Sequence, residues 1–298
     1  MNYYEEIKNE LINNEIYKKV KDYSKNRHDL MTYYNVGKLL VEAQGGEKRA
    51  KYGDKLIKEY SIKLSQELGK GYSTRSLKNM RLFYLFQKGQ TVSAKLSWSI
   101  YCELFKLKNK DTINYYVNMC SINNLSVREL RERIKNKEYE RLDKETKNKL
   151  IENKETNVDD LIKNPIIIHN ANNYELISEK VLKQMILEDL DNFLLELGNG
   201  FSYIASEYKI MINNRYNYID LLLFNYEFNC FVVVELKVTE LRKGHIGQIE
   251  VYMNYIDKNI RKINQDKTIG IIIVKKENKF IIEYTSDKRI IERSYIII

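Results

Sequence analysis

An apolar run that leads directly into two opposite charges is the sequence feature that most constrains the fold. Residues 231–234, Phe-Val-Val-Val, are typical of a strand that is buried on both faces. Glu235-Leu236-Lys237 follows with no turn residue between them. Because successive side chains of a strand point to opposite faces, Glu235 and Lys237 share one face and Leu236 takes the other. The run therefore predicts a central strand that ends in two charged side chains.

A second carboxylate precedes this strand. Asp220 follows Tyr218-Ile219 and leads into the apolar residues 221–224, and residues 225–229 can form a hairpin to the next strand. Antiparallel pairing then places Asp220 across from Glu235. Two carboxylates that meet repel each other unless a cation lies between them, and an all-oxygen site suits Mg²⁺. With Lys237 beside it, such a site could hydrolyse a phosphodiester; an ordinary ion pair at the end of a strand is the alternative.

The elements around these strands predict an α/β domain. A helix is expected over residues 179–197, ending at Gly198-Asn199-Gly200, and an amphipathic helix over residues 245–259. Strands are expected over residues 201–212, 216–224, 231–238, 269–275 and 279–284. Several strands interrupted by a helix indicate a mixed sheet.

The first half of the chain has a different pattern. Its apolar residues recur at helical spacing, as in Leu56, Ile57, Tyr60 and Leu64, and Ser126 begins a capping box with Glu129. Residues 139–164 are charged and rich in Asn, and the sole proline, Pro165, follows them. We therefore expect an all-α domain over residues 1–150, a linker over residues 151–165 and the α/β domain over residues 166–298.

The charges are divided unevenly between the two halves. Residues 1–150 contain 31 Lys and Arg against 19 Asp and Glu, whereas residues 151–298 contain 19 against 22. A basic half beside a slightly acidic one suggests that the first binds a polyanion such as nucleic acid. The alternative is an AT-rich genome that favours Lys and Asn codons.

A possible helix-turn-helix lies within the basic half. Residues 56–68 and 73–87 have the proportions of its two helices, and Arg75, Lys78 and Arg81 recur at every third position of the second. No acidic residue occurs between Gly69 and Leu96. These cations are candidates for binding DNA; a plain helical bundle that mediates dimerisation is the alternative.

Some classes of protein are disfavoured. No apolar run approaches the roughly 20 residues that cross a bilayer, and the acidic start of the chain is unlike a secretory signal. We therefore expect a cytoplasmic protein that does not contact membranes. Cys102, Cys120 and Cys230 lack metal-binding spacing and are expected to be small apolar residues.

Several short motifs together resemble the YhcG family of PD-(D/E)xK nucleases. In the second half these are Leu197-Gly198-Asn199-Gly200-Phe201, Tyr218-Ile219-Asp220-Leu221-Leu222, Val234-Glu235-Leu236-Lys237, and Gly247-Gln248 with Tyr252. The first half is similar at Val36-Gly37-Lys38-Leu39, Tyr52-Gly53 and Leu96-Ser97-Trp98-Ser99. The resemblance implies a two-domain α+β protein, with a helical N-terminal domain and a restriction-endonuclease-like C-terminal domain.

The resemblance also implies roles for individual residues. Asp220, Glu235 and the Leu236 carbonyl would ligate Mg²⁺ or Mn²⁺, and Lys237 would be catalytic. Gln248 and Tyr252 match an extension of the motif that borders the site. The superfamily tends to place a metal-binding glutamate on the first helix of the core, for which Glu188 is the expected residue and Glu196 the alternative. The proline that normally precedes the aspartate is replaced by Ile219, which affects the turn and removes no ligand.

The expected function is that of a metal-dependent DNA endonuclease whose basic helical domain engages DNA, with RNA not excluded as a substrate. A homodimer is expected, because one site cuts one strand. The alternatives are a DNA-binding or scaffolding protein that no longer cleaves, and a regulator with an appended ligand-binding domain.

Overall fold

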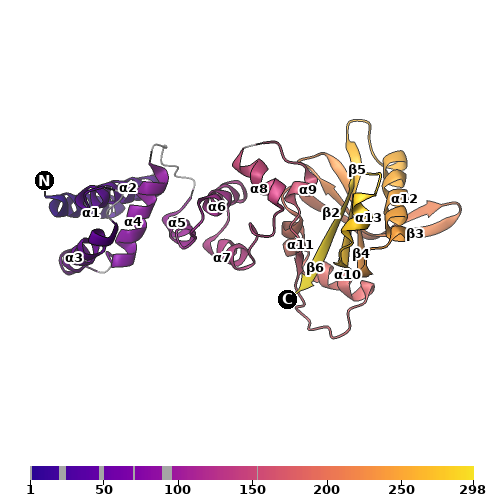
Figure 1. Cartoon of the computed structure of the whole chain (residues 1–298), viewed down its shortest axis with the longest axis horizontal. Coiled ribbons are helices and arrows are strands. Elements are labelled where there is room, and N and C mark those ends of the chain that lie inside the picture. The colour runs from indigo at the N-terminus through magenta and orange to yellow at the C-terminus, as the bar shows by residue number, and fades with distance from the viewer. Residues whose placement is uncertain (1, 20–24, 47–49, 70, 89–95, 153) are drawn as a thin grey trace. The chain divides into compact units, whose positions relative to one another are not determined.

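The computed structural model describes residues 2–19, 25–46, 50–69, 71–88, 96–152 and 154–298. The chain forms two compact units, Met1–Asn136 and Lys137–Ile298 (Figure 1). Among the described helices, none combines the length and the apolar character needed to cross a bilayer.

The first unit is helical throughout its described elements, as its apolar periodicity predicts. Its helices are α1 (Tyr3–Lys19), α2 (Lys25–Ala43), α3 (Ala50–Leu68), α4 (Thr74–Gln87), α5 (Trp98–Leu104), α6 (Lys110–Asn123) and α7 (Val127–Lys135). One core joins α1 to α4, and Trp98 packs against it with its ring 4.5 Å from that of Tyr33. The expected capping box of Ser126 and Glu129 begins α7.

Helix α4 crosses α2 at very short range. A Cβ atom on Gly37 would lie 2.1 Å from the backbone carbonyl oxygen of Met80, so only glycine fits at this crossing. Leu77, Met80 and Phe83 form the buried side of α4. Helix α4 nearly matches the expected residues 73–87, whereas α3 begins at Ala50, before the expected residue 56, and α2 is the helix that crosses α4 at this short range.

The second unit is built on a six-stranded mixed sheet with the strand order β1-β6-β5-β4-β3-β2. The strands are β1 (Ile166–Ile168), β2 (Phe201–Ile212), β3 (Arg215–Asn225), β4 (Cys230–Glu240), β5 (Asp266–Lys276) and β6 (Ile290–Ile297). β2, β3 and β4 are antiparallel neighbours, whereas β4, β5, β6 and β1 run parallel. The expected mixed sheet is confirmed.

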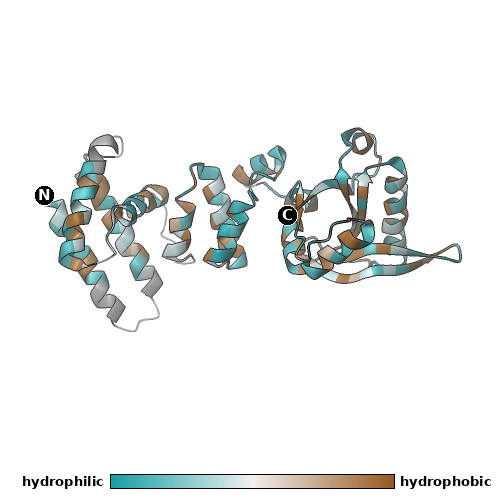
Figure 2. Cartoon of the chain, turned by 90° about the horizontal axis from the view of Figure 1, so that it is seen from below, coloured by the Kyte–Doolittle hydropathy of each residue, from teal (hydrophilic) through white to brown (hydrophobic). Residues whose placement is uncertain are grey.

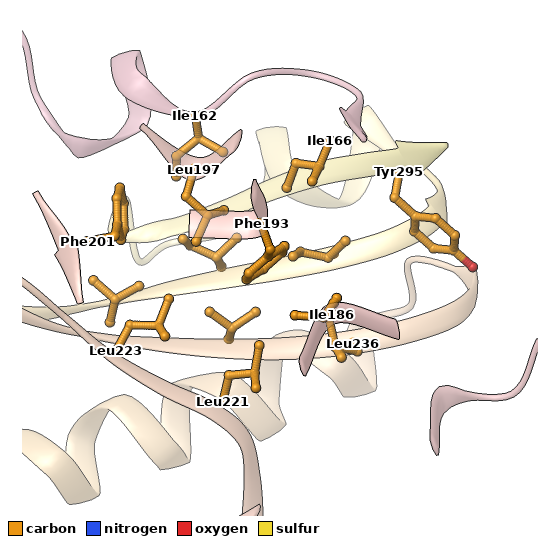
Figure 3. Close-up of a cluster of buried hydrophobic side chains, with 14 of the residues drawn as sticks. Ile162, Ile166, Ile186, Phe193, Leu197, Phe201, Leu221, Leu223, Leu236 and Tyr295 are labelled. Carbon is orange, nitrogen blue, oxygen red and sulfur yellow. The ribbon is translucent and has the colours of Figure 1, made fainter. Parts of the chain in front are cut away.

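Helices cover both faces of this sheet. On one face, α10 (Glu179–Glu188) and α11 (Leu190–Leu197) pack Ile186, Phe193 and Leu197 against the strands (Figure 3). On the other face, α12 (Lys243–Asn259) buries Ile249, Met253 and neighbouring apolar side chains. Figure 2 colours the ribbon by the hydropathy of each residue. The short helices α8 (Lys144–Ile151), α9 (Val158–Leu161) and α13 (Lys279–Glu283) complete the unit.

The structure differs from the expected secondary structure in two segments, residues 279–284 and residues 179–197. Residues 279–284, expected as a strand, contain the short helix α13, because the Asn278 side chain caps it by accepting from the N–H of Ile281. Its exposed rings, Phe280 and Tyr284, lie 4.8 Å apart at helical spacing. The strand beside β5 is instead β6. The expected helix over residues 179–197 is divided at Asp189, whose φ of −131° is not helical.

The boundary between the compact units comes earlier than the expected end of the first domain at residue 150. Arg141 forms a bidentate ion pair with Glu196 on α11. Thr146 and Lys149 on α8 both donate to Asp160 on α9. The charged stretch that resembled a linker therefore packs within the second unit, because its charges pair with one another.

Candidate active site

The expected site lies where two antiparallel strands separate. β3 and β4 pair from Leu221 opposite Val234 to Asn225 opposite Cys230, which confirms the expected hairpin. From Ile219 back to Arg215, β3 pairs with β2 alone. Asp220 and Glu235 are the first residues beyond the last pair of β3 and β4, so they face each other at the fork.

One backbone N–H and one lysine ammonium hold the Asp220 carboxylate in place. Its Oδ2 accepts a hydrogen bond from the backbone N–H of Leu236 at 3.0 Å, and its Oδ1 lies 3.2 Å from Nζ of Lys183 on α10. Lys183 also donates to Glu207 on β2 at 2.8 Å. Since the N–H and C=O of a strand residue face the same neighbour, the Leu236 carbonyl also points toward the side of Asp220.

Glu235 is a buried carboxylate that is only half satisfied. Its residue is 2% exposed, and its Oε2 accepts from Nζ of Lys237 at 3.2 Å. Its Oε1 is buried and has no hydrogen-bond partner. Burial, and then the charge of Asp220, raise the pKa of Glu235 to about 7. A buried acceptor of this kind is costly unless something binds it.

Lys237 lies between two carboxylates. Its Nζ is 3.2 Å from Glu235 and 3.7 Å from Glu179 at the start of α10. Burial opposes its charged form, but the charges of Glu235 and Glu179 outweigh burial and hold the pKa of Lys237 above its usual value. The ammonium therefore stays charged beside the two carboxylates.

Helix α12 brings a further polar pair to the site. Gln248 donates from Nε2 to the hydroxyl of Tyr252 at 3.1 Å. Burial, together with the charges of Glu235 and Asp220, raises the pKa of Tyr252, so this phenol shares the electrostatic environment of the two carboxylates. Leu236 points to the opposite core, against α10 and α11, as the strand alternation predicts.

The two glutamates expected on the first helix lie elsewhere. Glu188 is exposed and accepts from Tyr174 and Gln184. Glu196 forms its ion pair with Arg141. At 3.6 residues per turn, Glu188 falls on the opposite side of α10 from Glu179 and about 13 Å farther along its axis.

Glu179 and Lys183 are the residues of α10 that reach the site, and sequence reasoning missed both. Ser178 caps the helix by accepting from the N–H of Val181. The two residues are one turn apart and therefore share a side of the helix. The expected start of this helix at residue 179 was correct, but the sequence alone does not show that this end of α10 reaches the fork.

The oxygen atoms at the fork fit a divalent cation. Within the described residues, no group of three or more His, Cys, Asp and Glu side chains forms a metal cluster. Asp220, Glu235 and the Leu236 carbonyl instead offer a small set of hard oxygen donors, which suits Mg²⁺ because it keeps several waters and substrate oxygens. The unpartnered Oε1 of Glu235 is the atom that such a cation would satisfy.

Two family models together match most of the chain. The YhcG PDDEXK nuclease domain matches residues 159–296, which contain the fork and α12. The DUF1016 N-terminal domain matches residues 9–141, which run from within α1 to beyond the end of α7.

Known proteins are similar to parts of this chain. A relative from Escherichia coli (strain K12), described as "Putative nuclease YhcG", is 29% identical over 282 residues, covering 81% of this chain and 75% of its own. A repair endonuclease from Pyrococcus abyssi is 20% identical with a TM-score of 0.29, covering 42% of this chain. EndoMS bound to double-stranded DNA is 19% identical with a TM-score of 0.29. The chain spans about half the length of these two structures, 49% and 47%.

The fold, the fork with its two carboxylates and the two family matches agree. The chain belongs to the YhcG family of PD-(D/E)xK nucleases, in which a helical N-terminal domain precedes a restriction-endonuclease-like domain.

Proposed function

We propose that the C-terminal domain hydrolyses phosphodiester bonds in DNA with Mg²⁺ or Mn²⁺ held by Asp220, Glu235 and the Leu236 carbonyl. The observation that carries the proposal is the buried, unpartnered Oε1 of Glu235 beside a second carboxylate. A structural ion pair would satisfy both oxygens, and this one satisfies only Oε2. A bound cation would polarise the phosphodiester and lower the pKa of a water molecule.

The remaining side chains have separate roles in this proposal. The Lys237 ammonium stabilises the negative charge that develops on the attacked phosphate. Glu179 positions Lys237 from the side opposite Glu235, at 3.7 Å. Gln248 and Tyr252 form the border of the site on the α12 side and can donate hydrogen bonds to a nearby phosphate or water.

We propose that the helical domain engages DNA through its basic residues. Arg75 is exposed on the first turn of α4, and Lys78 follows it one turn later. Nε of Arg81 donates to Gln44 at 2.7 Å, so the other N–H groups of its guanidinium are the ones that bind DNA. An Arg75→Ala variant should bind DNA more weakly, by a similar factor for all sequences, with a smaller dependence of affinity on salt.

Cleavage of both strands of a duplex is simplest with two copies of this site. We therefore propose a homodimer, which sedimentation equilibrium of the full chain tests directly. A monomer at micromolar concentration that still cuts both strands would contradict it.

The central experiment measures cleavage of labelled DNA by the full chain as Mg²⁺ or Mn²⁺ is titrated. Asp220→Asn and Glu235→Gln should each lower the rate at least about 100-fold and leave DNA binding nearly intact, because each removes one negatively charged donor at the metal. Glu283→Gln, an exposed residue of α13, is the matched control. Equal rates for the wild type and both site variants would favour the alternative of a DNA-binding protein that does not cleave.

A further inference from the structure

Beyond the fork, β2 and β3 continue as a two-stranded ribbon. Residues 215–219 pair with β2 only, and Ile212 opposite Arg215 closes the hairpin through Asn213 and Asn214. Both asparagines have positive φ, 48° and 57°, as the tight turn between two strands requires. The ribbon projects past the rest of the sheet (Figures 1 and 2).

The two faces of this ribbon differ sharply. Ile210 and Ile219 are buried in the core beneath α12, with Tyr208 and Ile212 packed against it. The other face carries Tyr216 and Tyr218 with their cross-strand partners, Met211 and Lys209. Tyr216 is 59% exposed, Tyr218 52% and Met211 53%. Among the described residues, more than half of each of these three side chains is exposed, whereas Ile210 and Ile219 on the opposite face are buried.

The two exposed tyrosines lie on the same strand as Asp220. Tyr218 precedes Asp220 by two residues, and Tyr216 precedes it by four. At about 3.3 Å per residue, Tyr218 lies about 7 Å and Tyr216 about 13 Å from Asp220 along the strand. The farther distance corresponds to about four stacked nucleotides. A nucleic-acid strand with one phosphate at the fork would therefore reach these rings.

The charges of the ribbon favour a polyanion. Residues 208–219 include Lys209 and Arg215 and contain neither Asp nor Glu. Nζ of Lys209 lies 3.6 Å from the centroid of the Tyr216 ring. A cation beside an exposed ring suits a nucleotide, because the ring can stack on a base while the ammonium binds the phosphate.

A second copy of the chain fits this face less well. In a symmetric dimer the same patch meets itself, so Lys209 would face the equivalent cation of the other copy. Residues 208–219 offer no carboxylate to offset that repulsion, and the neighbouring Glu207 already pairs with Lys183.

We propose that the ribbon face formed by Lys209, Met211, Tyr216 and Tyr218 binds unpaired nucleotides next to the scissile phosphodiester, so that the substrate class is DNA with a single-stranded segment. The inference rests on the proposed function, because it places the substrate at Asp220 and Glu235. Bases within a continuous duplex have both faces covered by their neighbours, whereas an unpaired base can stack on tyrosine.

The test measures binding by the full chain in EDTA, where cleavage does not interfere. Labelled single-stranded DNA, a duplex with a single-stranded flap, a blunt duplex and single-stranded RNA of the same sequence are compared by fluorescence anisotropy. Tyr216→Ala/Tyr218→Ala should weaken binding of the first two by roughly 30-fold, since each stacked base contributes about 1–3 kcal/mol. Binding of the blunt duplex should change less than about twofold.

Two further variants make the result specific. Tyr216→Phe/Tyr218→Phe keeps both rings and should bind single strands like the wild type. Phe280→Ala/Tyr284→Ala removes two exposed rings from α13, 71% and 72% exposed, and should have no effect. Variants with unchanged circular dichroism exclude a folding defect.

Several outcomes would overturn the inference. These are an unchanged affinity for single strands in the Tyr216→Ala/Tyr218→Ala variant, an equal loss on the blunt duplex, tighter binding of RNA than of DNA, or a dimer that this variant converts to a monomer. The proposed function fails separately: a wild type that binds single strands through the ribbon but cleaves no DNA with any divalent metal contradicts the nuclease assignment alone. Metal-dependent cleavage with no role for the two tyrosines contradicts the ribbon alone.

Discussion

The Oδ2 atom of Asp220 accepts a hydrogen bond from the backbone N–H of Leu236 at 3.0 Å, across the point where β3 and β4 separate. The strand that carries Glu235 and Lys237 therefore also positions the carboxylate on the neighbouring strand. The distance between the two carboxylates is set by backbone pairing, with no contribution from a flexible loop. Asparagine at position 220 can keep this hydrogen bond while losing the charge, so the Asp220→Asn variant separates geometry from electrostatics.

The stability of the metal-free protein should fall as the pH rises from about 4.5 to about 7, in part because of Glu235. Its folded-state pKa of about 7 lies above the ordinary value of 4.5. The folded state is therefore favoured below pH 4.5, and this advantage is lost as the carboxyl ionises through pH 7, with a magnitude on the order of 3 kcal/mol. Scanning calorimetry in EDTA should show a smaller fall for Glu235→Gln, and saturating Mg²⁺ should raise the wild-type Tm at pH 8. An equally steep fall in both proteins would contradict this account of Glu235.

Lys237→Met should abolish cleavage while preserving the fold and the metal site. The Lys237 ammonium contacts Glu235 and Glu179, and in the proposed mechanism it is the charged group that stabilises the attacked phosphate. Loss of such a donor typically lowers rates by about 100- to 1,000-fold. Single-turnover cleavage gives the rate, and Mn²⁺ titration by calorimetry gives the metal affinity. Lys258→Met, at an exposed position of α12, is the control. A Lys237→Met protein that cleaves at the wild-type rate would remove this lysine from the mechanism.

Lys183→Met should bind divalent metal more tightly than the wild type. Nζ of Lys183 lies 3.2 Å from Oδ1 of Asp220, where it repels a cation and competes for the carboxylate. Removing this ammonium should improve affinity on the order of tenfold, as about 1.4 kcal/mol of repulsion is relieved. Lys180→Met, an exposed lysine of the same helix, controls for the general loss of charge. Weaker metal binding by Lys183→Met would mean that Lys183 orients Asp220 for the cation.

Gly37→Ala should destabilise the helical domain alone. The added Cβ would lie 2.1 Å from the Met80 carbonyl oxygen, so α2 and α4 must move apart, at a cost of roughly 1–3 kcal/mol. Trp98 is the chain's one tryptophan and lies in this domain, so its fluorescence during urea unfolding reports the domain separately. Gly244→Ala, where an added Cβ meets nothing within 4 Å, should leave that transition unchanged. An unchanged transition in Gly37→Ala would contradict the close crossing.

The central strands and their carboxylates were predictable because local rules determine them. A short hairpin forces antiparallel pairing, and strand alternation then fixes the faces of Glu235, Leu236 and Lys237. Glu179, the glutamate of α10 that reaches the site, was missed and Glu188 was expected instead. Choosing between them required knowing which side of α10 faces the fork. That side depends on tertiary packing, which one sequence does not display.

Two other errors have physical causes. Residues 279–284 are rich in β-branched and aromatic residues, but the Asn278 cap and the competing strand β6 determine their structure. The segment before Pro165 looked like a linker because charge was taken as a sign of solvation. Its charges are instead paired across the second unit, as Arg293 with Asp159 shows. Composition reports how polar a segment is, whereas only the fold reveals whether partners exist.

The continuity of β3 has a mechanical consequence. The strand runs without interruption from Arg215 at the tip of the ribbon through Asp220 to Asn225 in the core of the sheet. A force on Tyr216 or Tyr218 is therefore transmitted to Asp220 along a few residues of the β3 backbone. We therefore expect a molecule that bends or twists the ribbon to shift Asp220 relative to Glu235, which would couple binding at the ribbon to the geometry of the proposed site.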